Sequence, residues 1–277
     1  MQKSTIARTL MALGFSTCAA AAGWAQQDQT EAQDQQTQQQ VGQEPEIIAL
    51  DTWNYDELYA DGWSLEEFVD EAEVRGPGGD EIGDIENVVF DEKNRITAVI
   101  AEVGGFWDIT DTHVAVPWDE VEVGAGLEYV QIPVTEETVE DYPIYGEYSL
   151  FTEDAANNTR VVDDELATGP RLWKATEVLG DYALLADRAG YGYVEDLIID
   201  DQGMVDAIVV SAASRYGPGS YAYPFYGYGY GFEPGDPWYD LRYDDSDVAD
   251  LETFDEDRLD DDREAAADDD QEQAAAD

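Results

Sequence analysis

The sequence is short of cysteine and histidine, and each shortage excludes a class of site. The one cysteine, Cys18, lies in an N-terminal segment that we expect to be removed. The mature chain is therefore expected to contain no disulfide, thiolate metal site or cysteine nucleophile. His113 is the only histidine, which excludes a histidine-based triad or a multi-histidine metal site within one chain. A Gly-x-Ser-x-Gly elbow and a glycine-rich phosphate loop are also absent.

Basic residues are scarce as well. The 277 residues include 13 Lys and Arg against 65 Asp and Glu, which gives a formal net charge of -52. Such a chain repels nucleic-acid phosphates and anionic lipid headgroups, so neither class of partner is expected. It also repels itself, and salt should relieve that repulsion. The composition fits a saline habitat or diffuse cation association, and charge alone does not choose between them.

The two ends of the chain have the composition of targeting and tail segments. Lys3 and Arg8 precede an Ala-rich apolar run, and small residues end at Ala25. This pattern predicts a signal peptide over residues 1–25 and an exported protein, periplasmic or secreted. The apolar run is too short for a membrane span, so none is expected in the mature chain. A Gln-rich tether (26–46) and an acidic tail (255–277) are predicted to be disordered.

Between these ends the sequence repeats itself. Gly-Asp-Ile-Glu-Asn-Val-Val-Phe-Asp at 83–91 corresponds to Gly-Tyr-Val-Glu-Asp-Leu-Ile-Ile-Asp at 192–200, 109 residues later, and the same offset continues through the next apolar run. A collinear set of matches at one spacing indicates duplication. We therefore predict two copies of one module, over residues 62–143 and 172–254, joined by a linker over 144–171.

Each copy has the pattern of a small β unit. In the first copy, β-branched runs at 84–90 and 95–103 flank a polar turn at 91–94; the turn of the second copy is at 200–203. Such runs around a polar turn predict a β-hairpin. Stretches 64–69 and 175–179 predict short helical turns, and the glycines at 76–79 predict another hairpin turn. The expected fold is mainly β, with two tandem small six-stranded barrels, because closure removes exposed edges.

The motifs of the first copy also resemble a known family. The run at 83–91, followed by Arg-Ile-Thr-Ala-Val-Ile, Val-Gly-Gly-Phe and His-Val-Ala-Val-Pro-Trp-Asp-Glu-Val, resembles the PRC-barrel domain. The resemblance covers most of 62–143 and, more loosely, 172–252, where Ala-Ser-Arg at 213–215 replaces Gly-Gly-Phe. It implies a six-stranded β-barrel that acts by docking on partners and has no set of catalytic residues.

The ionisable residues do not form a pattern that predicts catalysis. Carboxylates recur in both copies, as Asp84 with Glu86 and as Glu195 with Asp196, and a solvated strand face explains them. His113 is interpreted as a residue at the end of a strand. The turn at 200–203 has only part of the spacing of an EF-hand loop. We therefore predict a protein that is not an enzyme, with no catalytic, cofactor or metal residues.

The most unusual segment is the Tyr- and Gly-rich stretch 216–240. Tyr and Trp favour binding surfaces because they offer a large area and a polar tip. The candidate partner-binding residues are Tyr221, Tyr223, Phe225, Tyr226, Tyr228, Tyr230 and Trp238. The same stretch is equally compatible with a loop that folds back over the protein itself.

The predicted function is protein docking or scaffolding in the cell envelope. Its partner would be an envelope protein or a surface polymer. The alternative is binding of Ca²⁺ or carbohydrate through the acidic surface and the Tyr-rich stretch.

Overall fold

The structure, a computed structural model, describes residues 45–104, 112–145, 150–163 and 166–259. The predicted signal peptide, the tether up to residue 44 and the tail from residue 260 lie outside the described residues. From Glu46 onward the described residues belong to one compact unit. None of the helices in this part of the chain has the length and apolar character needed to cross a membrane.

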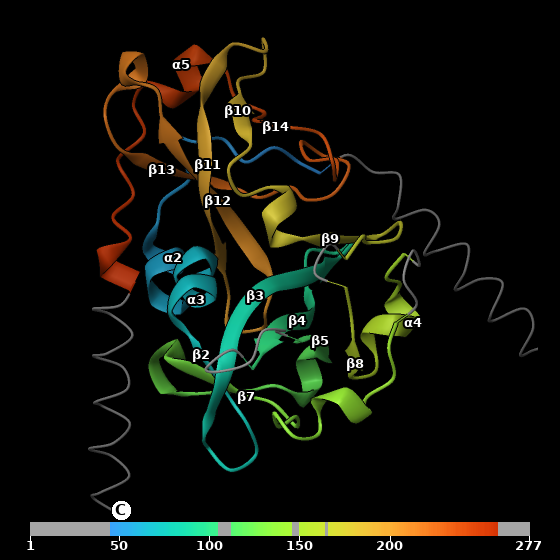
Figure 1. Ribbon diagram of the computed structural model, residues 1–277. Coiled ribbons are helices and arrows are strands. Elements are labelled where there is room, and N and C mark those ends of the chain that lie inside the picture. The colour runs from blue at the N-terminus through green and yellow to red at the C-terminus, as the bar shows by residue number, and fades with distance from the viewer. Residues whose placement is uncertain (1–44, 105–111, 146–149, 164–165, 260–277) are drawn as a thin grey trace, which may run out of the picture. The chain divides into compact units, whose positions relative to one another are not determined.

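The first sheet contains most strands of the first copy, together with two strands from later in the chain. Its pairing order is β6-β7-β2-β3-β4-β5-β8, with β9 paired to β3 (Figure 1). The strands are β2 (Glu73–Arg75), β3 (Glu81–Asp91), β4 (Ile96–Val103), β5 (Thr112–Pro117), β6 (Glu122–Val123), β7 (Tyr129–Gln131), β8 (Arg160–Val161) and β9 (Leu172–Lys174).

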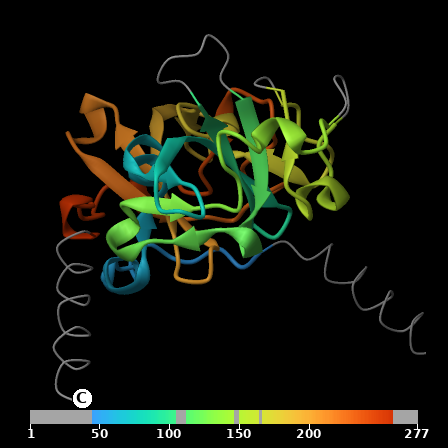
Figure 2. The same ribbon diagram turned by 60° about the horizontal axis from the view of Figure 1, so that its bottom comes forward.

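The second sheet contains most strands of the second copy, in the order β13-β12-β11-β10-β14, and β1 of the first copy pairs with β11. The yellow and orange strands of this sheet lie beside the cyan and green strands of the first in both views (Figures 1 and 2). The strands are β1 (Trp63–Ser64), β10 (Tyr182–Leu184), β11 (Gly190–Ile199), β12 (Val205–Ala212), β13 (Ser220–Pro224) and β14 (Trp238–Asp240).

The helices of the described residues are all short. The α-helices are α2 (Asp56–Asp61), α3 (Leu65–Glu71), α4 (Glu153–Ala156) and α5 (Asp245–Val248). Single 3-10 turns are η1 (Trp118–Glu120), η2 (Ala125–Leu127), η3 (Val139–Asp141), η4 (Ala175–Glu177) and η5 (Ser214–Tyr216). Helix α3 begins where predicted because the Ser64 side chain accepts a hydrogen bond from the Glu67 N–H at 3.0 Å.

The strand registers show the duplication directly. The pair Asp84–Glu102 of β3 and β4 becomes Tyr193–Ser211 of β11 and β12, and every pair of the two ladders keeps the 109-residue offset, bulges included. The turns also agree: Asn94 (φ 64°) and Gly203 (φ 75°) hold the same left-handed position. The predicted hairpins are thus confirmed in both copies.

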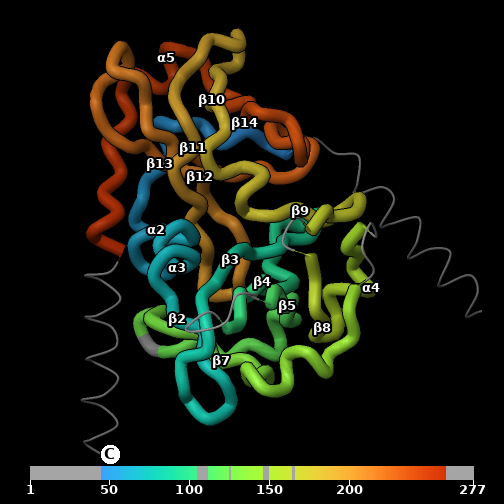
Figure 3. Tube along the Cα trace, in the orientation of Figure 1, coloured from blue at the N-terminus to red at the C-terminus, as the bar shows by residue number. Residues whose placement is uncertain are grey.

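The two copies exchange short strands. Trp63 in β1 pairs with Ile199 of the second copy, and Trp173 in β9 pairs with Phe90 of the first. The two exchanges mirror each other, since Trp63 Nε1 donates to the Asp200 carbonyl at 3.2 Å and Trp173 Nε1 to the Asp91 carbonyl at 3.1 Å. Figure 3 shows β9 crossing to the end of β3.

The hairpin turns of the two copies also meet at this junction. The Ile96 N–H donates to the Gly203 carbonyl at 2.9 Å, and the Val205 N–H to the Asn94 carbonyl at 3.0 Å. The largest buried cluster accordingly contains residues of both copies, from Val88 and Val116 to Trp173 and Tyr223. The two copies therefore share one core.

A mainly β fold is confirmed, with fourteen strands in two sheets among the described residues. One sheet curls as half a barrel. The expected closure into two six-stranded barrels is not confirmed, because the described strands of each sheet pair along an open path. Each copy also places one strand against the other copy, since β9 and β1 pair with β3 and β11 beside these paths.

Residues 144–171, expected to be a linker, pack on the first sheet where they are described. Strand β8 pairs with β5, and a second buried cluster includes Phe151, Ala155 and Leu172. At the other end of the chain, Leu259 is buried although it belongs to the predicted acidic tail. Both segments therefore contribute packing to the fold.

Candidate functional site

The seven aromatic residues predicted to bind a partner are mostly used inside the protein. Tyr221, Tyr223 and Phe225 are buried, and Tyr226, Tyr228 and Tyr230 are half-buried. Trp238 is 36% exposed and lies under Arg188, with 5.4 Å between the guanidinium carbon and the ring centroid.

Self-packing explains much of the Tyr-rich stretch. The Tyr223 hydroxyl donates to the Tyr191 hydroxyl at 2.6 Å, and Tyr226 and Tyr243 share a hydrogen bond of 2.8 Å. Burial raises the pKa of Tyr191 to about 12 and that of Tyr223 further still, so these phenols stay protonated. Of the two interpretations of this stretch, folding back over the protein describes most of it.

Of the predicted ionisable residues, the structure brings His113 and Glu86 into contact. His113 lies near the start of β5, but its side chain is not the solvent-facing one expected there: it is only 16% exposed, and its Nε2 is 3.1 Å from Glu86 Oε2. Asp84 lies on β3 and Glu195 on β11, where the Ser220 hydroxyl donates to the Glu195 carboxylate. These contacts pair a hydroxyl with a carboxylate and an imidazole with a carboxylate at two different places in the fold.

Asp196 differs from these carboxylates because it is buried. Its Oδ1 accepts from the Glu66 N–H at 2.8 Å and from the Leu197 N–H at 2.7 Å, and its Oδ2 has no hydrogen-bond partner among the described residues. Burial raises its pKa to about 8 despite the hydrogen bonds from Glu66 and Ser64, and the charge of Glu256 adds to the rise. Asp196 is thus a structural carboxyl that ties the exchanged segment to β11.

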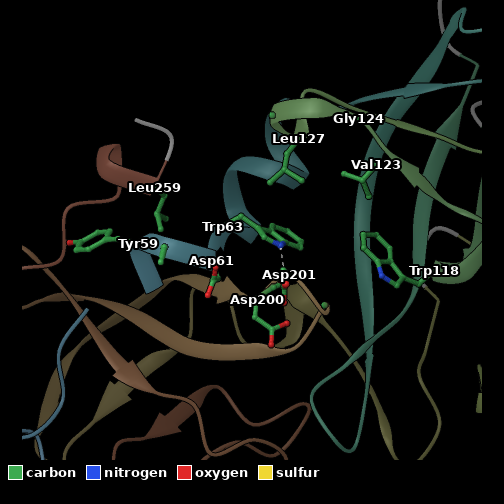
Figure 4. A pocket seen from close by; sticks show the side chains of 14 residues that line it. Tyr59, Asp61, Trp63, Trp118, Val123, Gly124, Leu127, Asp200, Asp201 and Leu259 are labelled. Carbon is green, nitrogen blue, oxygen red and sulfur yellow. Dashed lines mark hydrogen bonds between the residues drawn. The ribbon is translucent and has the colours of Figure 1, made fainter. Parts of the chain in front are cut away.

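A pocket of about 390 Å³ lies where the two copies meet. Its apolar lining includes Trp63, Trp118, Val123 and Leu127. Figure 4 shows Trp63 and Leu127 on one side and Val123 and Trp118 on the other. The volume falls in the range of sites that hold small ligands or single anchor side chains.

Several elements position this lining. Strand β1 holds Trp63 against the second copy, and Phe68 of α3 contacts it at a ring-centroid distance of 5.0 Å. Phe68 also lies 6.4 Å from the ring of Trp118, which begins η1. Val123 remains 38% exposed although its neighbours are apolar. Strand pairing and ring packing therefore hold the apolar side of the pocket in place.

The rim of the pocket is acidic. Asp61 is the last residue of α2, and Asp200 and Asp201 lie in the turn of the second copy. The residues that line the pocket include no Lys or Arg. Asp200 already accepts from the Gln202 and Met204 N–H groups at 2.9 and 2.7 Å. The combination of aromatic walls and carboxylates favours an apolar group with a neighbouring positive charge.

The sequence did not point to this pocket. Trp118 belongs to the His-Val-Ala-Val-Pro-Trp motif, but nothing in the sequence predicts that Trp118 or Trp63 binds a partner. The sequence carries one weak signal for the pocket. Val123, in Glu-Val-Gly-Ala-Gly, corresponds to Phe232 of the second copy, so a smaller side chain replaces an aromatic ring. Only the exchange of strands brings the turn at 200–203 to the wall of the first copy.

The fold and this pocket define a mainly β protein built by duplication, with an apolar opening at the junction. Residues 70–139 match the PRC-barrel domain, so the chain is a PRC-barrel domain-containing protein. The matched stretch lies in the first copy and begins after Trp63. Among curated proteins, none matches the chain.

Proposed function

We propose that this protein is a non-enzymatic docking module and that the Trp63/Trp118 pocket is its contact site. The observation behind the proposal is an apolar pocket that is left open at the surface, where Val123 is 38% exposed. A PRC-barrel domain is compatible with protein interaction, but fold alone does not assign function. The apolar lining and acidic rim support binding of a polypeptide.

The most deeply buried carboxyl among the described residues does not favour catalysis. The raised pKa of Asp196 belongs to a carboxyl inside the core, away from open solvent. A general base must instead reach a substrate proton. We also propose that the protein acts outside the cytoplasm, on the basis of its N-terminal sequence pattern.

Site-specific photocrosslinking in the producing cells tests the proposal. A photoreactive residue replaces Asp201 at the pocket rim or, as a control, Ile144, which is 77% exposed on another part of the surface. We expect a discrete protein adduct from position 201 that disappears when Val123→Phe fills the pocket. Equal adducts from both positions, or an adduct that persists in Val123→Phe, would contradict the proposal.

A second candidate function, carbohydrate binding, is favoured by a row of exposed rings. Tyr193, Tyr182 and Trp238 are register neighbours on β11, β10 and β14, with exposures of 52%, 54% and 36%. The rings of Tyr182 and Tyr193 are 4.8 Å apart. The first copy has Glu73 and Asp84 at the two tyrosine positions, so the row belongs to the second copy alone.

Such rings offer flat apolar faces with polar tips, which suits a neutral sugar. Retention on neutral polysaccharide columns would fall for the double variant Tyr182→Ala/Trp238→Ala and persist in Val123→Phe. Equal retention of the double variant would remove this candidate. No side-chain arrangement of the described residues favours the calcium alternative, since no group of three or more His, Asp or Glu is placed to hold a metal there.

A further inference from the structure

The open pocket has an occupied equivalent in the same chain. Trp173, the counterpart of Trp63, is fully buried. Phe232 covers it at a ring-centroid distance of 5.1 Å, and Phe225 lies 5.7 Å away. Phe232 itself is 1% exposed. In the second copy, therefore, an aromatic side chain fills the space beside the exchanged Trp.

Backbone register identifies the residue that replaces Phe232 in the first copy. Glu122 pairs with Gln131 there, and in the second copy the Asp240 N–H donates to the Gly231 carbonyl at 2.7 Å, a pairing displaced by the 109-residue offset. Val123 follows Glu122 in the first copy, and Phe232 follows Gly231 in the second, so Val123 and Phe232 are equivalent positions. Val123, which is 38% exposed, thus occupies the position at which the phenyl ring of Phe232 is buried in the second copy.

The charges at the two positions differ in the same way. The turn of the first copy contains Glu92, and Arg171 binds its carboxylate with two hydrogen bonds of 2.8 Å. The counterpart of Arg171, two residues before the exchanged Trp, is Asp61. The turn of the second copy contains Asp201 in place of Glu92. At the open pocket, then, Val123 and Asp61 stand at the positions of Phe232 and Arg171, although Phe68 packs against Trp63 from another side and the Arg258 guanidinium lies 3.8 Å from the ring centroid of Tyr59.

We propose that the open pocket binds an aromatic side chain of a partner polypeptide that has a Lys or Arg within two or three residues. The partner supplies from outside what Phe232 and Arg171 supply within the chain. Burial of the ring removes apolar area from water. The cation meets Asp61 and Asp201, and the charge of -52 attracts basic segments from a distance. This inference rests on the proposed docking function and specifies its ligand.

Binding of blocked peptides to the full chain tests the inference. The probe is Gly-Gly-Lys-Gly-Phe-Gly-Gly, with two comparison peptides in which Ala replaces Phe or Glu replaces Lys. We expect one saturable site for the probe at 0.1 M salt, with affinity at least tenfold lower for each comparison peptide. Val123→Phe should abolish binding, while Ile144→Phe, which adds the same ring on an exposed surface, should leave it unchanged.

A second variant separates charge from shape. Asp61→Arg introduces the cation of the other copy, and it should remove the preference for Lys over Glu while keeping the preference for Phe over Ala. Equal binding of all three peptides, or binding that survives in Val123→Phe, would overturn the inference. Photocrosslinking at Asp201 that depends on the pocket, without any binding of the probe, would leave docking intact and refute this ligand class. A dimer of the chain that Val123→Phe dissociates would assign the pocket to a second copy and likewise refute it.

Discussion

Asn87 and Asp196 occupy the same bulged position in the two copies and differ only in an amide against a carboxyl. Both are buried, and each accepts a hydrogen bond from the N–H of the next residue. Asn87 Nδ2 donates to the Thr176 hydroxyl at 2.9 Å, which is a neutral contact to an exchanged segment. Asp196 makes the corresponding connection to Glu66 with a group that can ionise.

Replacement of Asp196 by Asn should change how stability depends on pH. Its folded pKa, about 8, lies above the unfolded value, so its stabilising contribution is complete at low pH and is lost as pH rises toward 8. Asp196→Asn should gain on the parent by roughly 1 kcal/mol per pH unit between pH 5 and 8. Urea unfolding at several pH values measures this difference.

The matched control is Asn87→Asp, which places a carboxyl in the first copy. It should lose stability relative to the parent as pH rises, the opposite trend. A pH-independent difference for both variants would show that Asp196 ionises freely in the folded protein.

At the scale of elements, the exchanged strands connect the copies. Trp173 of β9 stacks on Phe90 of β3 at 4.3 Å, with an interplanar angle of 16°. The contact joins a residue of one copy to the sheet of the other. Loss of one exchanged side chain should therefore disturb both copies.

We predict that Trp173→Ala destabilises the protein by about 3–5 kcal/mol, as expected for truncation of a fully buried aromatic side chain. Hydrogen exchange should speed up at residues 89–91 of the first copy as well as in β9. Trp238→Ala, which removes an exposed ring, should change stability by less than about 1 kcal/mol. Faster exchange confined to the second copy would contradict the shared core.

A reciprocal swap tests whether the two pockets are equivalent. Val123→Phe should stabilise the protein by roughly 0.5–2 kcal/mol, because the new ring fills an apolar opening. Phe232→Val should cost about 2 kcal/mol, because it leaves a cavity beside Trp173. Urea midpoints measure both changes. A loss of stability in Val123→Phe would mean that the ring does not enter the pocket.

Local signals explain which elements could be predicted. The hairpins around 91–94 and 200–203 follow from β-branched runs and from Asn94 and Gly203 at left-handed positions. The short α3 follows from its Ser64 cap. The exchange of β1 and β9 could not be predicted, because a strand of two or three residues has little preference of its own and takes its partner from tertiary packing.

At the scale of the whole molecule, the duplication was visible in the sequence but its consequence was not. Repeated motifs predict two units, and two separate barrels were the simplest arrangement. The pocket depends on residues from α2, the 118–127 segment and the turn at 200–203, which only the shared core brings together. The composition of the Tyr-rich stretch favours a binding site there, whereas the Trp63/Trp118 pocket is open because the small residue Val123 stands at the position of Phe232.

Self-repulsion also acts on the whole molecule. Raising NaCl from 0.1 to 1 M shortens the Debye length from about 10 Å to about 3 Å. The Tm should therefore rise with NaCl at pH 7, where the formal charge is -52. At pH 4, where the carboxylates begin to protonate, the rise should be smaller. A Tm that does not respond to salt at pH 7 would show that repulsion does not limit stability.

Whether the pocket binds an aromatic side chain is tested most directly by NMR, with the tryptophan indole N–H signals followed while the Lys- and Phe-containing peptide is added. If the pocket binds the aromatic side chain, the signals of Trp63 and Trp118 shift in a saturable way and that of Trp173, already covered by Phe232, stays in place. Shifts of the Trp173 signal equal to those of Trp63, or no shift of the Trp63 and Trp118 signals at saturating peptide, would show that the aromatic side chain does not bind in this pocket.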